Sequence, residues 1–108
     1  MTARRTAAAA LVLAAAGVAG CTRRPAQSRS VAIAGFVYQP AALVISPGDT
    51  VVWTNRDIVP HTATARDSAW DSGALAGGGS WRLSPRSPGR HDYYCVFHPN
   101  MRGTIEVR

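Results

Sequence analysis

Lysine is absent from this chain of 108 residues, and all twelve basic residues are arginines. Five of these arginines precede residue 31. From Val31 onward, seven arginines and six acidic residues leave a net charge of +1, compared with +6 for the whole chain. That part of the chain also has no basic stripe interleaved with aromatic side chains. The composition therefore gives nucleic-acid binding little weight.

Cysteine is scarce, with only Cys21 and Cys95 in the chain. A disulfide is the usual expectation for two cysteines in a small exported protein. The contexts of these two differ, however, because Cys21 closes an apolar leader and Cys95 lies in a cluster of histidine and methionine. We therefore expect separate roles for the two thiols.

A long apolar run is also missing. The alanine-rich stretch from Ala7 to Ala19 is too short for a membrane-spanning helix, and it follows Arg4 and Arg5 as in an export signal. Residues 1–20 are accordingly predicted to be a signal peptide. The sequence Val18-Ala19-Gly20-Cys21 resembles a bacterial lipobox, which predicts lipidation of Cys21 and anchoring to a membrane by several acyl chains. The alternative is an ordinary signal peptide cut at small residues.

The polar stretch that follows contains Pro25 and cannot build a core, so residues 21–30 are predicted to be a lipidated cysteine and a flexible linker. Residues 31–108 form the predicted folded domain. The protein is expected to be exported, to a periplasmic or other extracytoplasmic location, and to be a monomer.

Short β-type runs separated by glycine, proline, asparagine and aspartate fill the domain, and no helical period is present. Ser46-Pro47-Gly48-Asp49 is a typical turn, because proline presets φ and glycine accepts a positive one. Strand spacing predicts an all-β fold, an antiparallel Greek-key sandwich of seven to eight strands. The expected strands are 31–38, 43–45, 50–54, 61–65, 80–83, 90–97 and 103–107, with Trp53 buried and 67–79 mostly loop.

The side chains best suited to bind a metal are those of Cys95, His98 and Met101, which are spaced three residues apart. A strand that ends at Cys95, followed by a tight loop, would bring all three to one end of the sandwich. His61 follows Pro60 in an earlier loop and could join them. Two imidazoles and a thiolate in a plane, with a distant thioether, form the donor set of blue-copper electron-transfer sites.

The sequence resembles the cupredoxin family of blue-copper proteins, and its Cys95-x-x-His98-x-x-Met101 loop is similar to that of amicyanin. The resemblance implies that His61, Cys95 and His98 are equatorial ligands of one type 1 copper ion and that Met101 is the axial ligand. It covers most of residues 31–108. The motifs that carry it are Gly48-Asp49-Thr50-Val51 with Trp53 and Asn55, Pro60-His61, Pro88-Gly89 and the ligand loop.

One position departs from the pattern. Many relatives carry asparagine after the first histidine, where it helps to fasten the two ligand loops, and this chain has Thr62. The Thr62 N–H could still reach the sulfur of Cys95, but a side-chain bridge would be shorter. The third histidine, His91, is expected to lie outside the site.

The expected function is one-electron transfer by cycling between Cu(II) and Cu(I), without enzymatic activity. The resemblance implies transient docking of redox proteins, such as a c-type cytochrome, a dehydrogenase or an oxidase, at an apolar surface around His98 that includes Pro60, Phe97 and Pro99. A copper store or chaperone without redox turnover is the main alternative. An enzyme that uses Cys95 as its nucleophile and a structural zinc site are the others.

Overall fold

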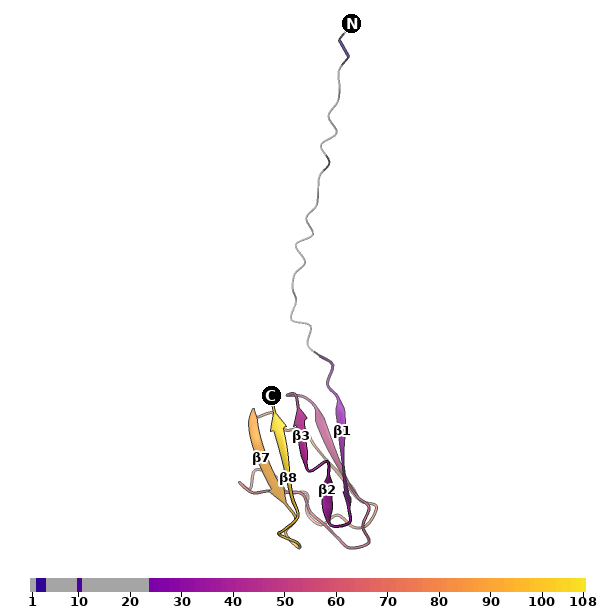
Figure 1. The fold of residues 1–108 in the computed structure, drawn as a ribbon, viewed down its shortest axis with the longest axis vertical. Helices are drawn as coiled ribbons and strands as arrows, with labels where there is room; N and C mark the ends of the chain where they lie inside the picture. Colours follow the sequence, from indigo (N-terminus) through magenta and orange to yellow (C-terminus); the bar gives the residue numbers. More distant parts are fainter. Residues whose placement is uncertain (1, 4–9, 11–23) are drawn as a thin grey trace.

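The computed structural model describes residues 24–108, together with 2, 3 and 10 (Figure 1). The predicted signal peptide, except for those three positions, and Cys21 lie outside the described residues. The described part of the chain forms strands and loops, and none of it is a helix long and apolar enough to cross a membrane. The strands are β1 (Ser28–Ala34), β2 (Val37–Gln39), β3 (Ala42–Ile45), β4 (Thr50–Asn55), β5 (Thr64–Ala65), β6 (Ser80–Leu83), β7 (Gly89–Tyr94) and β8 (Arg102–Val107).

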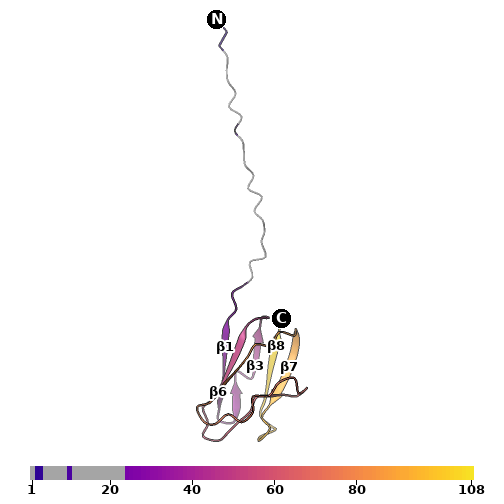
Figure 2. The same cartoon turned by 180° about the vertical axis from the view of Figure 1, so that it is seen from behind.

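The strands form two four-stranded sheets, with the orders β2-β1-β4-β6 and β3-β8-β7-β5. The two sheets pack as the layers of a sandwich, which Figure 2 shows from behind. The predicted all-β sandwich is confirmed. Each sheet is mixed, because β1 runs parallel to β4 and β3 runs parallel to β8, while the other pairs are antiparallel.

The first strand differs from the prediction. The expected single strand 31–38 is two strands, joined by a two-residue turn at Gly35 and Phe36, and β1 begins at Ser28, three residues before Val31. Gly35-Phe36 has only one residue that favours the left-handed backbone of such turns. The turn between β1 and β2 therefore depends on hydrogen bonds to Asp57, which is distant in the sequence. The local sequence does not predict this turn.

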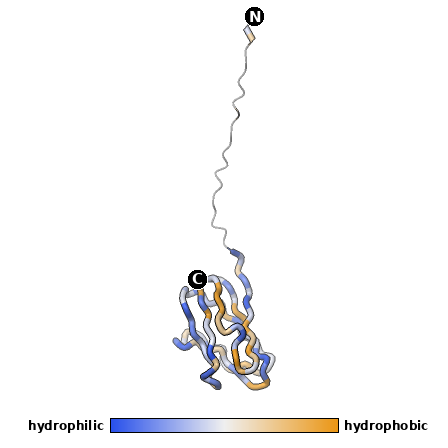
Figure 3. The backbone as a smooth tube through the Cα atoms, viewed as in Figure 1, coloured by the Kyte–Doolittle hydropathy of each residue, from blue (hydrophilic) through white to orange (hydrophobic). Residues whose placement is uncertain are grey.

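The core lies between the sheets, where alternate residues of each strand point inward. Trp53 is fully buried, as predicted, and its ring centroid lies 5.4 Å from that of Tyr93 and 5.5 Å from those of Trp70 and Trp81. Tyr93 is also fully buried, and so is Cys95, which follows the last residue of β7. In Figure 3 apolar stretches run along the strands and also gather at the lower end of the sandwich.

The two ends of the sandwich have different roles. In Figure 1 the chain enters β1 and leaves β8 at the upper end. The β1–β2 turn and the β7–β8 connection lie at the lower end. The residues that the sequence predicts to bind copper belong to connections at that lower end, and they are therefore remote from the start of the folded domain.

Candidate metal centre

Three donor side chains meet at the lower end of the sandwich. The ligand atoms of His61, Cys95 and His98 all lie within 4.8 Å of one another. The Nδ1 atoms of His61 and of His98 each lie 3.7 Å from Sγ of Cys95. His61 and Cys95 are fully buried, whereas His98 is half-buried. The structure thus brings together three residues that are separated in sequence by up to 37 positions.

The loop after β7 carries two of these donors and is closed by its own backbone. Cys95 N–H donates to Met101 O (3.3 Å), His98 N–H donates to Cys95 O (3.3 Å), and Met101 N–H donates to His98 O (2.8 Å). These bonds fold the loop tightly. The Met101 side chain is 4% exposed and belongs to the same buried cluster as Cys95, as expected of a residue that closes the site.

His61 comes from the long connection between β4 and β5, which Asn55 organises. The Asn55 side-chain amide donates to the carbonyls of Val59 (2.8 Å) and Leu75 (2.9 Å). Leu75 in turn forms a reciprocal backbone pair with His61, with N–O distances of 2.7 and 3.1 Å. The buried amide therefore fixes the backbone on both sides of the histidine.

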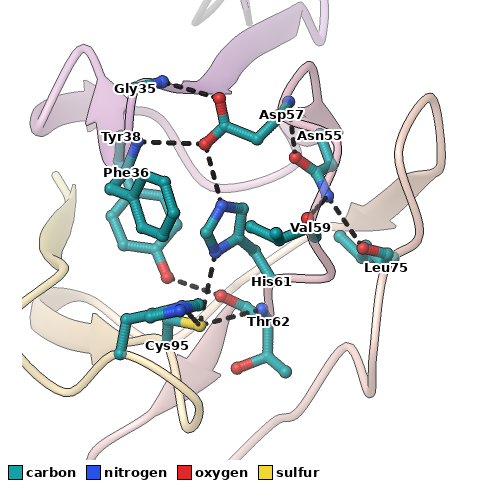
Figure 4. Close-up of polar contacts among 11 residues, drawn as sticks. Gly35, Phe36, Tyr38, Asn55, Asp57, Val59, His61, Thr62, Leu75 and Cys95 are labelled. Carbon is teal, nitrogen blue, oxygen red and sulfur yellow. Dashed lines mark hydrogen bonds and ion pairs between the residues drawn. The ribbon is translucent and has the colours of Figure 1, made fainter.

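The Asp57 carboxylate sets the tautomer of His61. Its Oδ2 lies 2.8 Å from Nε2 of His61 (Figure 4). The backbone N–H groups of Phe36 and Gly35 hold the pKa of Asp57 below its usual value. The carboxylate is therefore an acceptor, so Nε2 carries the hydrogen. The lone pair of His61 is then on Nδ1, the nitrogen nearest to the sulfur, which is the arrangement that a metal ligand needs.

Phe36 lies over the site on the β1–β2 turn. Its φ is +61°, a left-handed conformation that is uncommon for a bulky residue. Asp57 holds the turn there by accepting from Gly35 N–H (2.7 Å) and Phe36 N–H (3.0 Å). The phenyl ring is edge-on to both imidazoles, with centroid distances of 5.1 Å to His61 and 4.9 Å to His98.

Thr62 fastens the two ligand loops together, although it replaces the expected asparagine. Its N–H donates to Sγ of Cys95 (3.4 Å), and its Oγ1 accepts from the N–H of Val96 (3.0 Å). The Tyr38 hydroxyl donates to the carbonyl of Thr62. Burial raises the pKa of Tyr38, which keeps this donor protonated. A side-chain bridge is therefore present, and it is made by a hydroxyl group.

The donor set fits copper. Soft sulfur combined with imidazole selects copper over the hard cations. Bonds of about 2.0–2.3 Å from a transition-metal ion to nitrogen and sulfur place donors in a trigonal plane roughly 3.5–4 Å apart. The two observed nitrogen–sulfur distances of 3.7 Å fall in that range. Buried Met101 adds a thioether, which argues against a structural zinc site.

Comparisons with known proteins also indicate a copper-binding protein. Residues 26–108 match the family described as copper binding proteins, plastocyanin/azurin family. Amicyanin-alpha of Methylorubrum extorquens is 29% identical over 104 residues, which cover 92% of this chain and 87% of that protein. Amicyanin of Paracoccus denitrificans is 34% identical over 82 residues, which cover 71% of this chain and 63% of that protein.

Solved structures show the same likeness. A Cu(I) form of an amicyanin mutant superposes with a TM-score of 0.71 at 29% identity, over 75% of this chain and 82% of that chain. A copper-containing nitrite reductase from Thermus scotoductus gives a TM-score of 0.70 at 28% identity, but the match covers only 22% of the reductase. That likeness concerns one part of a larger enzyme.

The sandwich and its buried nitrogen–sulfur site define a copper protein of the type 1 pattern. The chain belongs to the copper-binding proteins of the plastocyanin/azurin family, and the resemblance to cupredoxins is confirmed. Copper is therefore the cofactor. Family membership places the chain with copper-binding electron-transfer proteins, and the cysteine-nucleophile enzyme and the zinc site are set aside.

The remaining predicted residues lie at the surface or outside the described part. Pro60, Phe97 and Pro99 are exposed. His91 lies on β7, where its Nε2 donates to the carbonyl of Ser87 (2.7 Å). Reasoning from sequence missed Asp57 and Phe36. The acidic residue four positions before His61 was a usable signal for the first, whereas nothing local indicated that Phe36 would cover the site.

Proposed function

We propose that this protein carries single electrons on one copper ion, which the imidazoles of His61 and His98, the thiolate of Cys95 and the thioether of Met101 would hold. The observation that carries the proposal is the preformed site, in which the lone-pair nitrogen of His61 and Nδ1 of His98 both lie 3.7 Å from the Cys95 sulfur. Copper, when bound, supplies the couple between Cu(II) and Cu(I). The protein holds the ligands in one geometry for both states.

The hydrogen bonds around the site support that role. Asp57 fixes the ring of His61, Thr62 fixes the sulfur of Cys95, and the backbone of the 95–101 loop closes on itself. Groups that are already ordered do not have to rearrange when the charge of the site changes, and such preorganisation lowers the barrier to electron transfer. A store that must release copper has no need of it.

Electrons are proposed to enter and leave through His98, the half-buried ligand. Exposed apolar side chains surround it: two shallow hollows meet at Phe36, one lined by His98 and Pro99 and the other by Ile58 and Val59. We call this surface the His98 face; it comprises Phe36, Ile58, Val59, Pro60, Phe97 and Pro99. Ile58 is 97% exposed and Phe97 is 53% exposed. A small apolar face suits brief docking of redox proteins such as a c-type cytochrome, a dehydrogenase or an oxidase.

An exported location and a lipid anchor on Cys21 complete the proposal. The folded domain begins at the end of the sandwich opposite the His98 face (Figure 1). An anchor that joins the domain at this end would therefore leave the His98 face free to meet partners. Mass spectrometry of the membrane fraction tests the anchor: an acylated N-terminal Cys21 supports it, and a mature protein that begins after Cys21 refutes it.

Redox cycling distinguishes a carrier from the copper store considered above. The copper-loaded domain should be reduced by one equivalent of a mild reductant and then reoxidised repeatedly, with retention of the metal throughout. A store would hold Cu(I), remain colourless and release the ion to a chelator. Loss of copper during the first cycle would contradict the carrier proposal.

A further inference from the structure

A line of hydroxyl groups connects the ligand loop to the irregular segment 67–79. Val96 N–H donates to Thr62 Oγ1 (3.0 Å), Thr62 Oγ1 lies 2.9 Å from Thr64 Oγ1, and Thr64 Oγ1 donates to Oδ1 of Asp71 (3.0 Å). The two threonines are 1% and 8% exposed, whereas Asp71 is exposed. The line thus begins at the residue after Cys95 and ends at the surface.

The direction of each hydrogen bond in this line follows from elementary donor and acceptor chemistry. A carboxylate can only accept, so the single hydroxyl hydrogen of Thr64 points to Asp71. The hydrogen between the two threonines must then come from Thr62. Oγ1 of Thr62 then donates toward Thr64 and accepts from Val96 N–H, which can only donate. The carboxylate at the surface therefore sets the direction of both hydroxyl bonds that lead to Thr62.

Asp71 is itself held in place. The next residue, Ser72, is hydrogen-bonded to Ala63, which directly precedes β5. Ser72 N–H donates to Ala63 O (3.1 Å), and Ala63 N–H donates to Ser72 Oγ (2.8 Å). Thr64 and Asp71 also form an isolated β-bridge. A fixed acceptor at the end of a buried line polarises each hydroxyl in turn, which strengthens the bonds together.

We infer that Asp71 is a positioning residue for the copper site and acts through Thr64 and Thr62 on the peptide that follows Cys95. Thr62 holds Cys95 from two sides, since its own N–H donates to the sulfur and its hydroxyl accepts from the next residue. The hydroxyl line thereby takes the structural role of the asparagine that many relatives carry, which explains why threonine suffices at this position. The inference rests on the proposed copper ligands.

Thr64→Val tests the line with little change of shape. Asp71→Ala tests it from the exposed end, where it also removes the acceptor of Gly73 N–H (2.9 Å). Both should free the Thr62 hydroxyl to rotate, weaken its bond to Val96 and accelerate exchange of the Val96 amide hydrogen in the apo-protein by about three- to tenfold. Thr64→Ser, which keeps the hydroxyl, should restore slow exchange. Thr54→Val is the matched control, because it removes a 2.9 Å hydroxyl pair with Ser80 on the other sheet.

Copper release to a chelator is the second measurement. Loss of a group that orients a ligand typically weakens metal binding by about 10–100-fold, so Thr64→Val and Asp71→Ala should release copper at least tenfold faster, whereas Thr64→Ser and Thr54→Val should not. Unchanged Val96 exchange in both variants would overturn the inference, as would faster exchange with unaltered copper release. Failure of the unmodified protein to bind copper would instead refute the proposed function, and the apo-protein exchange data separate the two cases.

Discussion

The imidazole of His61 is held between Asp57 and Cys95. Its Nε2 lies 2.8 Å from the carboxylate of Asp57, and its Nδ1 lies 3.7 Å from the sulfur. The same carboxylate accepts from the two backbone N–H groups of the Gly35-Phe36 turn. One acidic side chain therefore fixes both a proposed copper ligand and the turn that carries the aromatic ring next to it.

Asp57→Ala should weaken copper binding by about 10–100-fold, because the ring of His61 can then rotate or adopt the other tautomer. Asp57→Asn should lose less, since the amide oxygen can still accept. Competition with a copper chelator measures the affinities, and nitrogen chemical shifts of His61 in the apo-protein report the tautomer. Asp67→Ala, in an exposed turn, is the control. Equal affinities for Asp57→Ala and Asp67→Ala would show that Asp57 does not orient the ligand.

Electron self-exchange tests the His98 face without knowledge of the partner. Two copies that meet at this face would bring their apolar surfaces together, so Phe97→Glu or Ile58→Glu would place like charges opposite each other. We expect either variant to lower the self-exchange rate at least tenfold, as measured by NMR line broadening in mixtures of the oxidised and reduced protein.

Val44→Glu provides the control for this experiment. Val44 is 45% exposed, a fraction similar to that of Phe97, but it lies on β3 outside the His98 face. The electron self-exchange rate of the Val44→Glu variant should stay within twofold of that of the unmodified protein. A rate that falls equally in Val44→Glu would assign the effect to overall charge, and an unchanged rate in Phe97→Glu would move the electron path elsewhere.

Gly103 and Tyr93 lie directly opposite each other on β8 and β7. A Cβ atom at Gly103 would be 2.2 Å from Cζ of Tyr93, so the aromatic ring occupies the space that a side chain would need. Gly103→Ala should lower the free energy of unfolding by about 1–3 kcal/mol. The penalty should shrink in a Tyr93→Leu background, as chemical denaturation of the four proteins in a double-mutant cycle would measure. Additive effects would argue against the clash.

Asp49 makes stability depend on pH. The backbone N–H groups of Ser46 and Gln27, together with the side chain of Arg24, hold its pKa below the ordinary carboxyl value. The resulting stabilisation is complete above about pH 4 and is lost as the pH falls through the lowered pKa. Asp49→Asn should therefore unfold at a lower temperature at neutral pH, and the gap should close toward pH 2. Thermal unfolding curves that stay parallel across this range would contradict the assignment.

The sequence predicted much of the fold, and it predicted that His61 and Cys95 would meet at one end of the sandwich, as they do. The signals for the fold and for the 95–101 loop are local. Ser46-Pro47-Gly48-Asp49 forms the expected turn, with Gly48 at φ +94° and Asp49 N–H donating to Ser46 O (3.0 Å). Alternation along the expected strand 90–97 puts Tyr93 and Cys95 on one face, and both are fully buried, although β7 already ends at Tyr94. Cys95, His98 and Met101 lie within one short loop, so their spacing was informative.

The unpredicted features all depend on long-range contacts. Phe36 adopts its left-handed backbone because Asp57, 21 residues later, accepts its N–H group. The bridge made by Thr62 depends on Val96, 34 residues away, and the Thr62 hydroxyl is linked through Thr64 to Asp71. The parallel pairing of β1 with β4 likewise joins strands that are distant in sequence. Neither propensity nor periodicity reports such partners.

The visible spectrum of the domain loaded with one equivalent of Cu(II) tests the central claim most directly. A thiolate and two imidazoles around one ion predict an intense blue charge-transfer band, which should bleach on reduction, return on oxidation and disappear in Cys95→Ser. A protein that stays colourless after oxidation, or whose weak absorption survives the loss of the Cys95 sulfur, would contradict the electron-carrier account.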